Sequence, residues 1–177
     1  ALVSKPDTKD LFDGSPQQFL AFMKTHEIAV QTMDNPSLKL QTLMNAVTTR
    51  VGRDVEHCRM LEPNEGYARA IMLMWQRYGN PAQVREAVIG DLKKGNQIAR
   101  NDKSALLSLS MDVSAAHEIL KALASRTNGP YSYEHAADSF DIISDILARV
   151  PFYIDEYARW FQTSEDRCIF GNLRFFL

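Results

Sequence analysis

The sequence predicts an all-α protein, on three observations. Apolar residues recur at helical spacings of three and four in every long segment. Alternating Val, Ile and Thr runs bounded by hairpin turns are scarce. Helix-starting residues, above all proline preceded by Ser or Asn, stand at the beginnings of several periodic segments. The 177 residues suit one domain or two small ones.

The first helix is expected to begin at Pro16. Ser15 is a good N-cap, Pro16 fits the first helical position, and Gln18 completes the pattern of a capping box. The helix should end before Asn35-Pro36, since the residue before a proline avoids the α region. Its inward face is predicted to hold Phe19, Phe22, Met23 and Val30.

Prolines divide residues 36–95 into four more expected helices. Pro36 opens one of these helices. Glu62-Pro63-Asn64 interrupts the helical pattern, and Asn64 can cap the helix that follows. Gly79-Asn80-Pro81 should end that helix, and Pro81 should begin the next one. The apolar faces, in order, are expected to be Leu38, Leu40, Leu43, Met44 and Val47; Val51, Val55 and Cys58; Tyr67, Ala70, Ile71, Met74 and Tyr78; and Val84, Val88 and Leu92.

Residues 95–103 are polar, so we expect a boundary there between two lobes, residues 1–98 and 99–177. Asp102 or Ser104 should cap a long helix, and a loop should span residues 125–132. Two more helices are expected after the loop. Pro151 should end the first of them, and the second should cover residues 152–161, which makes about eight helices in all. The apolar residues of the long helix are expected to be Leu106, Leu109, Val113, Ala116, Leu120 and Leu123, and the inward residues of the next helix Ala136, Phe140, Ile143 and Leu147. The last helix carries Tyr153, Tyr157 and Trp160.

The charge is close to balanced, with a formal net charge of −2. Neither half is basic enough to be a nucleic-acid surface by charge count. No apolar run is long enough to predict a membrane span. Cys58 and Cys168 are far apart in sequence, so we expect two reduced thiols rather than a disulfide framework.

Each of the four histidines adjoins a glutamate, but the spacing does not predict a metal site. An HExxH motif needs a second histidine four residues after the first. Val30 stands at that position after His26, and Lys121 stands there after His117. His26 is therefore interpreted as a core or groove histidine on the apolar face of the first helix.

No catalytic motif is evident, so we expect neither an enzyme nor a cofactor site. His57-Cys58 suggests a thiol nucleophile, but neighbours on a helix need a special turn to form the required hydrogen bond. Asp13-Gly14-Ser15 has the wrong order for an aspartic protease and reads as a turn before an N-cap. The aromatic residues fit core packing, although Trp75 or Trp160 could instead be an exposed interface anchor.

Several blocks, in order, resemble the Gag-like domain of Bel/Pao-type LTR retrotransposon polyproteins. The resemblance is strongest over residues 5–95. His26 departs from the pattern, since an aromatic residue is usual there. The blocks are Leu11 to Phe19 with Phe22 and Glu27; Asn35 to Leu40 with Leu43; Gly52 to Val55; Glu65 to Ala70 with Tyr78 to Pro81; and Ile143, Ile146, Leu147, Val150-Pro151 and Trp160.

The resemblance implies a capsid protein with two capsid-like lobes, whose copies assemble into a shell around the element's RNA. It implies a cytoplasmic location in virus-like particles, RNA contact through another Gag region, and neither a membrane nor a small-molecule substrate. By the same resemblance, the contact between copies is expected in the C-terminal lobe, with Trp160, Tyr157 and Tyr153 as candidates. One alternative is a domesticated module that binds partner peptides in an N-lobe groove; another is an unrecognised hydrolase.

Overall fold

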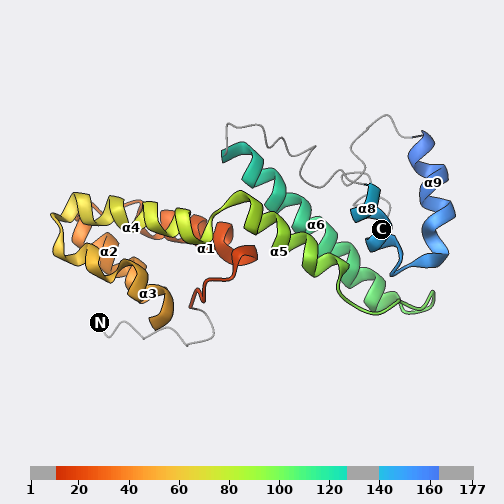
Figure 1. Cartoon of the computed structure of the whole chain (residues 1–177), viewed down its shortest axis with the longest axis horizontal. Helices are drawn as coiled ribbons and strands as arrows, with labels where there is room; N and C mark the ends of the chain where they lie inside the picture. The colour runs from red at the N-terminus through yellow and green to blue at the C-terminus, as the bar shows by residue number, and fades with distance from the viewer. Residues whose placement is uncertain (1–10, 127–139, 164–177) are drawn as a thin grey trace. The chain divides into compact units, whose positions relative to one another are not determined.

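The protein is all-α, and the computed structural model describes residues 11–126 and 140–163 (Figure 1). The chain forms two compact units, residues 1–84 and 85–177. The division falls within a helix, on the N-terminal side of the boundary expected between residues 98 and 99. The helices that begin in the first unit are α1 (Pro16–Val30), α2 (Pro36–Asn45), α3 (Thr49–Val55), the 3₁₀ helix η1 (Glu56–Met60), α4 (Pro63–Tyr78) and α5 (Pro81–Lys93).

The start of α1 is as predicted, but its cap is not the expected capping box. Ser15 is the N-cap residue and Pro16 the first residue of the helix, yet the Ser15 side chain caps no backbone N–H. Its hydroxyl instead donates to Asp13 Oδ1 at 2.5 Å. Gly14, between them, has φ +95°, a conformation that glycine adopts without the strain a Cβ would bring. The Asp13-Gly14-Ser15 turn is therefore closed by its own side chains.

Most of the predicted inward residues of the first unit form its core. Phe19, Met23, Leu43, Val51, Val55, Cys58, Ala70 and Met74 are each no more than 1% exposed. Leu38 contradicts the prediction, because 56% of its surface is exposed at the start of α2. Leu40 and Leu43 already supply the buried positions of this helix. Leu38 precedes Leu40 by two residues, which points it to a different side.

The residue before the turn, Phe12, joins parts of the unit that are distant in sequence. Its N–H donates to the Ala46 carbonyl and its carbonyl accepts from the Thr48 N–H, both at 3.0 Å, forming a parallel bridge with Val47. Its ring is 3% exposed and stacks on Phe22, with centroids 4.6 Å apart. The segment ahead of α1 is thus fixed to the connection between α2 and α3.

Close contact between α4 and η1 depends on a glycine. The helix α4 begins at Pro63 after the N-cap Glu62, so Asn64 is not the cap that was predicted. Gly66 is buried in its first turns, where a Cβ would overlap the Cys58 carbonyl oxygen. A side chain at residue 66 would therefore push α4 away from η1.

The second unit contains the rest of α5, α6 (Lys103–Arg126), α8 (Phe140–Leu147), the 3₁₀ helix η2 (Pro151–Tyr153) and α9 (Ile154–Thr163). Of the two predicted caps, Asp102 rather than Ser104 caps α6, because its Oδ1 accepts from the Ala105 N–H at 3.0 Å. The predicted stripe of α6 is mostly buried, although Leu106 is only half-buried. Ala136 lies outside the described residues. The core residues of this unit are Val88, Ile89, Leu92, Ile98, Leu109, Val113, Ala116, Leu120, Leu123, Ile143, Ile146, Leu147, Val150 and Tyr157.

Arg149 connects the end of α5 to the segment after α8. Its Nη1 donates to the Leu92 carbonyl at 2.9 Å, and its carbonyl accepts from the Ile98 N–H at 2.7 Å. Gly95, with φ +124°, lies directly against the guanidinium group. The first part of the polar stretch 95–103 is therefore tied into the second unit, with Ile98 buried.

Phe19→Ala should destabilise the first unit by about 3–5 kcal/mol, because the ring is fully buried and its loss leaves a cavity. Ile28→Ala on the same helix is the control, since Ile28 is 64% exposed and should change stability by no more than about 0.5 kcal/mol. Urea unfolding followed by circular dichroism measures both. Equal losses in the two variants would show that this face of α1 is not the core.

Two glycine-to-alanine substitutions should have opposite signs. Gly66→Ala should destabilise the protein, because the new methyl group meets the Cys58 carbonyl oxygen. Gly90→Ala in α5 should stabilise it by up to about 1 kcal/mol, since nothing lies within 4 Å of its Cβ and alanine favours the helix. Thermal unfolding distinguishes them, and a stabilising Gly66→Ala would contradict the packing of α4 on η1.

Candidate functional site

The three predicted interface residues, Tyr153, Tyr157 and Trp160, differ in how far the structure shows them to be exposed. Tyr157 in α9 is buried, with 5% of its surface exposed. Tyr153 in η2 is half-buried and packs against Phe152, with ring centroids 4.7 Å apart. The Trp160 side chain lies outside the described part of the chain. The interface at these residues stays a prediction, and Tyr157 is placed to pack within its own unit.

The first unit gathers its aromatic side chains around Phe12. Tyr78 lies edge-on to Phe12 at 5.6 Å, and Phe19 lies at 5.9 Å. Trp75 in turn packs edge-to-face on Phe19 at 4.9 Å and is half-buried. Edge-to-face and offset pairs of this kind are favourable beyond the area they bury. Phe12 therefore fills the space between α1 and the end of α4 with its own ring.

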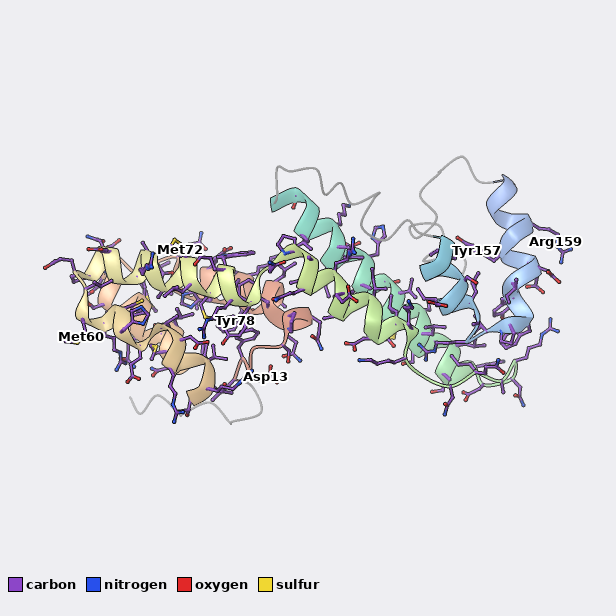
Figure 2. All side chains as sticks on the ribbon, viewed as in Figure 1. Asp13, Met60, Met72, Tyr78, Tyr157 and Arg159 are labelled. Carbon is purple, nitrogen blue, oxygen red and sulfur yellow. The ribbon has the colours of Figure 1, made fainter. Side chains whose placement is uncertain are left out.

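A polar network borders the aromatic cluster. The Tyr78 hydroxyl donates to Asp54 Oδ2 at 2.5 Å, and Arg77 forms an ion pair with the same carboxylate. The Tyr78 hydroxyl, and then Arg77, hold the pKa of Asp54 below its ordinary value. Arg50 donates to the Asp13 carbonyl oxygen (Asp13 and Tyr78 are labelled in Figure 2). These contacts connect α3 and α4 to the turn before α1, so we interpret them as stabilising the fold rather than as a catalytic site.

His26 is a core residue, as predicted, and is 3% exposed. Its Nε2 lies 3.1 Å from the Tyr67 hydroxyl, while its buried Nδ1 has no hydrogen-bond partner. Burial lowers the pKa of His26, because the charged ring would lose its hydration. The same burial raises the pKa of Tyr67. The pair is neutral near pH 7 and connects α1 to α4.

The side chains of the neighbours His57 and Cys58 do come close together, because the chain forms a 3₁₀ helix at this point. They lie in η1, and Cys58 Sγ is 3.9 Å from His57 Nε2. However, Cys58 is fully buried, and its burial raises the pKa of the thiol. A nucleophilic cysteine needs a lowered pKa and access to substrate. The arrangement is that of a buried structural thiol.

Metal ligands do not gather in the part of the chain that the structure describes. Among those residues, no group of three or more His, Cys, Asp or Glu side chains could hold a metal ion. In the same residues, no helix is both long and apolar enough to cross a membrane.

Several large apolar side chains are exposed, and of these the sequence pattern predicts only Leu38, as an inward residue. Among the residues that the structure describes, the most exposed of these is Met60 in η1, at 89%. Leu107 and Met111 in α6 are each 63% exposed and stand one helical turn apart. Their spacing of four, on the side opposite the buried stripe, was the signal that could have found them. The exposed set is Ile28, Leu38, Met60, Leu61, Met72, Leu107, Met111 and Ile154.

Comparison with known families finds a match over residues 12–134, to the family described as Protein of unknown function (DUF1759). The chain belongs to this family. The match begins at Phe12, which anchors the first unit, and extends past the end of α6. No curated protein and no solved structure matches the chain significantly. Membership in DUF1759 therefore rests on both units rather than on one motif.

The stability of this DUF1759 protein should fall as the pH is lowered through the range in which histidine titrates. The pKa of His26 is lowered in the folded state, so the unfolded chain takes up a proton first. The free energy of unfolding is highest above about pH 6.5, the ordinary histidine value, and declines below it until the folded pKa is reached. Denaturant unfolding at a series of pH values measures this decline.

His26→Gln should remove most of that decline, because glutamine does not titrate and can still reach the Tyr67 hydroxyl. His57→Gln is the matched control, since His57 is exposed and the decline should persist in that variant. A decline unchanged in His26→Gln would assign the pH dependence to other groups.

Proposed function

We propose that the chain is a structural Gag capsid protein that self-assembles into a shell enclosing retrotransposon RNA. The observation that carries the proposal is the family membership, because DUF1759 is found in Gag and polyprotein regions of retrotransposons. The resemblance of the ordered sequence blocks to Bel/Pao-type Gag supports the same assignment. In this proposal the protein is not an enzyme, and it acts in the cytoplasm within virus-like particles.

The physical properties of the chain favour assembly over RNA binding as its own task. A formal net charge of −2 gives copies little mutual repulsion and offers RNA little attraction. RNA contact is therefore assigned to another region of the Gag polyprotein. Exposed apolar side chains occur in both units, for example Met72 in the first and Met111 in the second. A shell built from many copies needs weak contacts of this kind, repeated many times.

The second candidate function is a domesticated Gag-derived module that binds partner peptides in a groove of the first unit. The observation that bears on it is the aromatic cluster, where Phe12 lies between α1 and α4 and is held by two backbone hydrogen bonds. A partner peptide that used this site would first have to displace residues 11–13. This extra cost ranks the binding module below the capsid.

Assembly of the purified protein should increase with salt concentration. Salt screens the repulsion between like-charged copies over about 10 Å at 0.1 M, whereas apolar contacts survive screening. Light scattering should therefore rise from low to high salt at fixed protein concentration, and negative-stain microscopy should show closed particles. A protein that stays strictly monomeric at millimolar concentration and high salt would contradict the capsid proposal and leave the binding module ahead.

A further inference from the structure

The helix α6 exposes an apolar stripe on the side opposite its core. Leu107 and Met111 are each 63% exposed, and Ala115, one turn further on, is also exposed. Residues four apart share a side of a helix, so the three form one line. The other side of α6 carries the buried Leu109, Val113, Ala116 and Leu120. We call Leu107, Met111 and Ala115 the α6 stripe.

We propose that the α6 stripe is a contact between two copies of this chain, in which the two α6 helices pack antiparallel about a two-fold axis at Met111. The inference rests on the proposed self-assembly and names a surface that carries it. A two-fold contact uses the same patch on both copies, so that patch must complement itself. The α6 stripe can be tested for this property residue by residue.

The sizes of the side chains complement one another under that symmetry. The two-fold axis passes through Met111 of both helices. A residue that precedes Met111 in one helix therefore lies level with the residue that follows Met111 by the same number of positions in the partner helix. Leu107 of each copy then lies level with Ala115 of the other, so a large side chain meets a small one. Ser104 and Ser108 flank the line and are exposed, and short side chains let two helices approach closely.

The charges complement one another as well. Lys103 at the start of α6 is level with residue 119 of the partner helix, which places it beside Glu118 of that helix. Both side chains are exposed in a single copy, in which Glu118 Oε1 also lies 3.6 Å from His117 Nδ1 of its own helix, so Lys103 of the partner copy would be an additional partner. By the two-fold symmetry the pair occurs twice, once on each side of Met111. Paired charges at the rim fix the antiparallel register more than they add affinity.

A second copy suits this patch better than a tight-binding partner does. A stable two-protein complex buries about 1,200–2,000 Å² in total. One leucine, one methionine and one alanine from each copy supply much less apolar area than that. The contact is therefore weak by itself and becomes effective only when it is repeated among many linked copies.

Charge exchange at Met111 tests the symmetry directly, in the full chain. Residue 111 of one copy meets residue 111 of the other, so Met111→Lys alone and Met111→Glu alone each place like charges at the axis. Each should raise the Kd of self-association about tenfold or more, as measured by sedimentation equilibrium. An equimolar mixture of the two variants should associate again, because Lys then meets Glu.

Met60→Lys and Met60→Glu are the matched controls, because Met60 is also an exposed methionine, in η1 of the other unit. They should leave self-association unchanged. Unaltered melting temperatures would show that the Met111 variants are folded. Wild-type association that Met111 variants do not weaken overturns the α6 contact and leaves the capsid proposal standing. A mixture no better than either variant alone, or an equal loss in the Met60 variants, also overturns it. A wild-type protein that does not associate overturns both.

Discussion

The first unit depends on the burial of Phe12. This side chain contacts α1 through Phe19 and Phe22 and contacts α4 through Tyr78, while its backbone is paired with Ala46 and Thr48. One residue thus joins both helices to the connection between α2 and α3. A buried loop segment needs partners for its backbone N–H and C=O groups, so the two hydrogen bonds allow the Phe12 ring to be buried. The polar network at Asp54 and the Asp13 turn then fix the rim of the same cluster.

The local sequence determines much of this fold, and tertiary contacts determine the rest. Pro16, Pro36, Pro63 and Pro81 each open a helix because proline fits the first helical turn and no later position. The bridge at Phe12 was not predictable from local pattern, since its partners are more than thirty residues away. The failed capping box at Ser15 has a local origin instead: the Ser15 hydroxyl lies against Asp13, two residues earlier, and donates to its carboxylate.

The candidate interfaces show why sites are harder to predict than helices. Helical period separates the two sides of a helix but does not say which side faces the core when both carry apolar residues. In α6 the continuous stripe through Leu109 and Val113 is the core, and the shorter line through Leu107 and Met111 is left exposed. In α9 the sequence offered Tyr157 as a contact residue, and the structure buries it. Exposure is a property of the packed chain, so it becomes visible only in three dimensions.

The Phe12 bridge also has a mechanical consequence. Any tension on the chain from the N-terminal side reaches Phe12 before it reaches α1. The load would fall first on an aromatic ring that is 3% exposed and on two backbone hydrogen bonds to the connection between α2 and α3. The first turn of α1 is shielded from that pull, because Gly14 and the Asp13–Ser15 hydrogen bonds lie behind the anchor. The buried and hydrogen-bonded Phe12 thus keeps the N-terminal end of α1 from fraying.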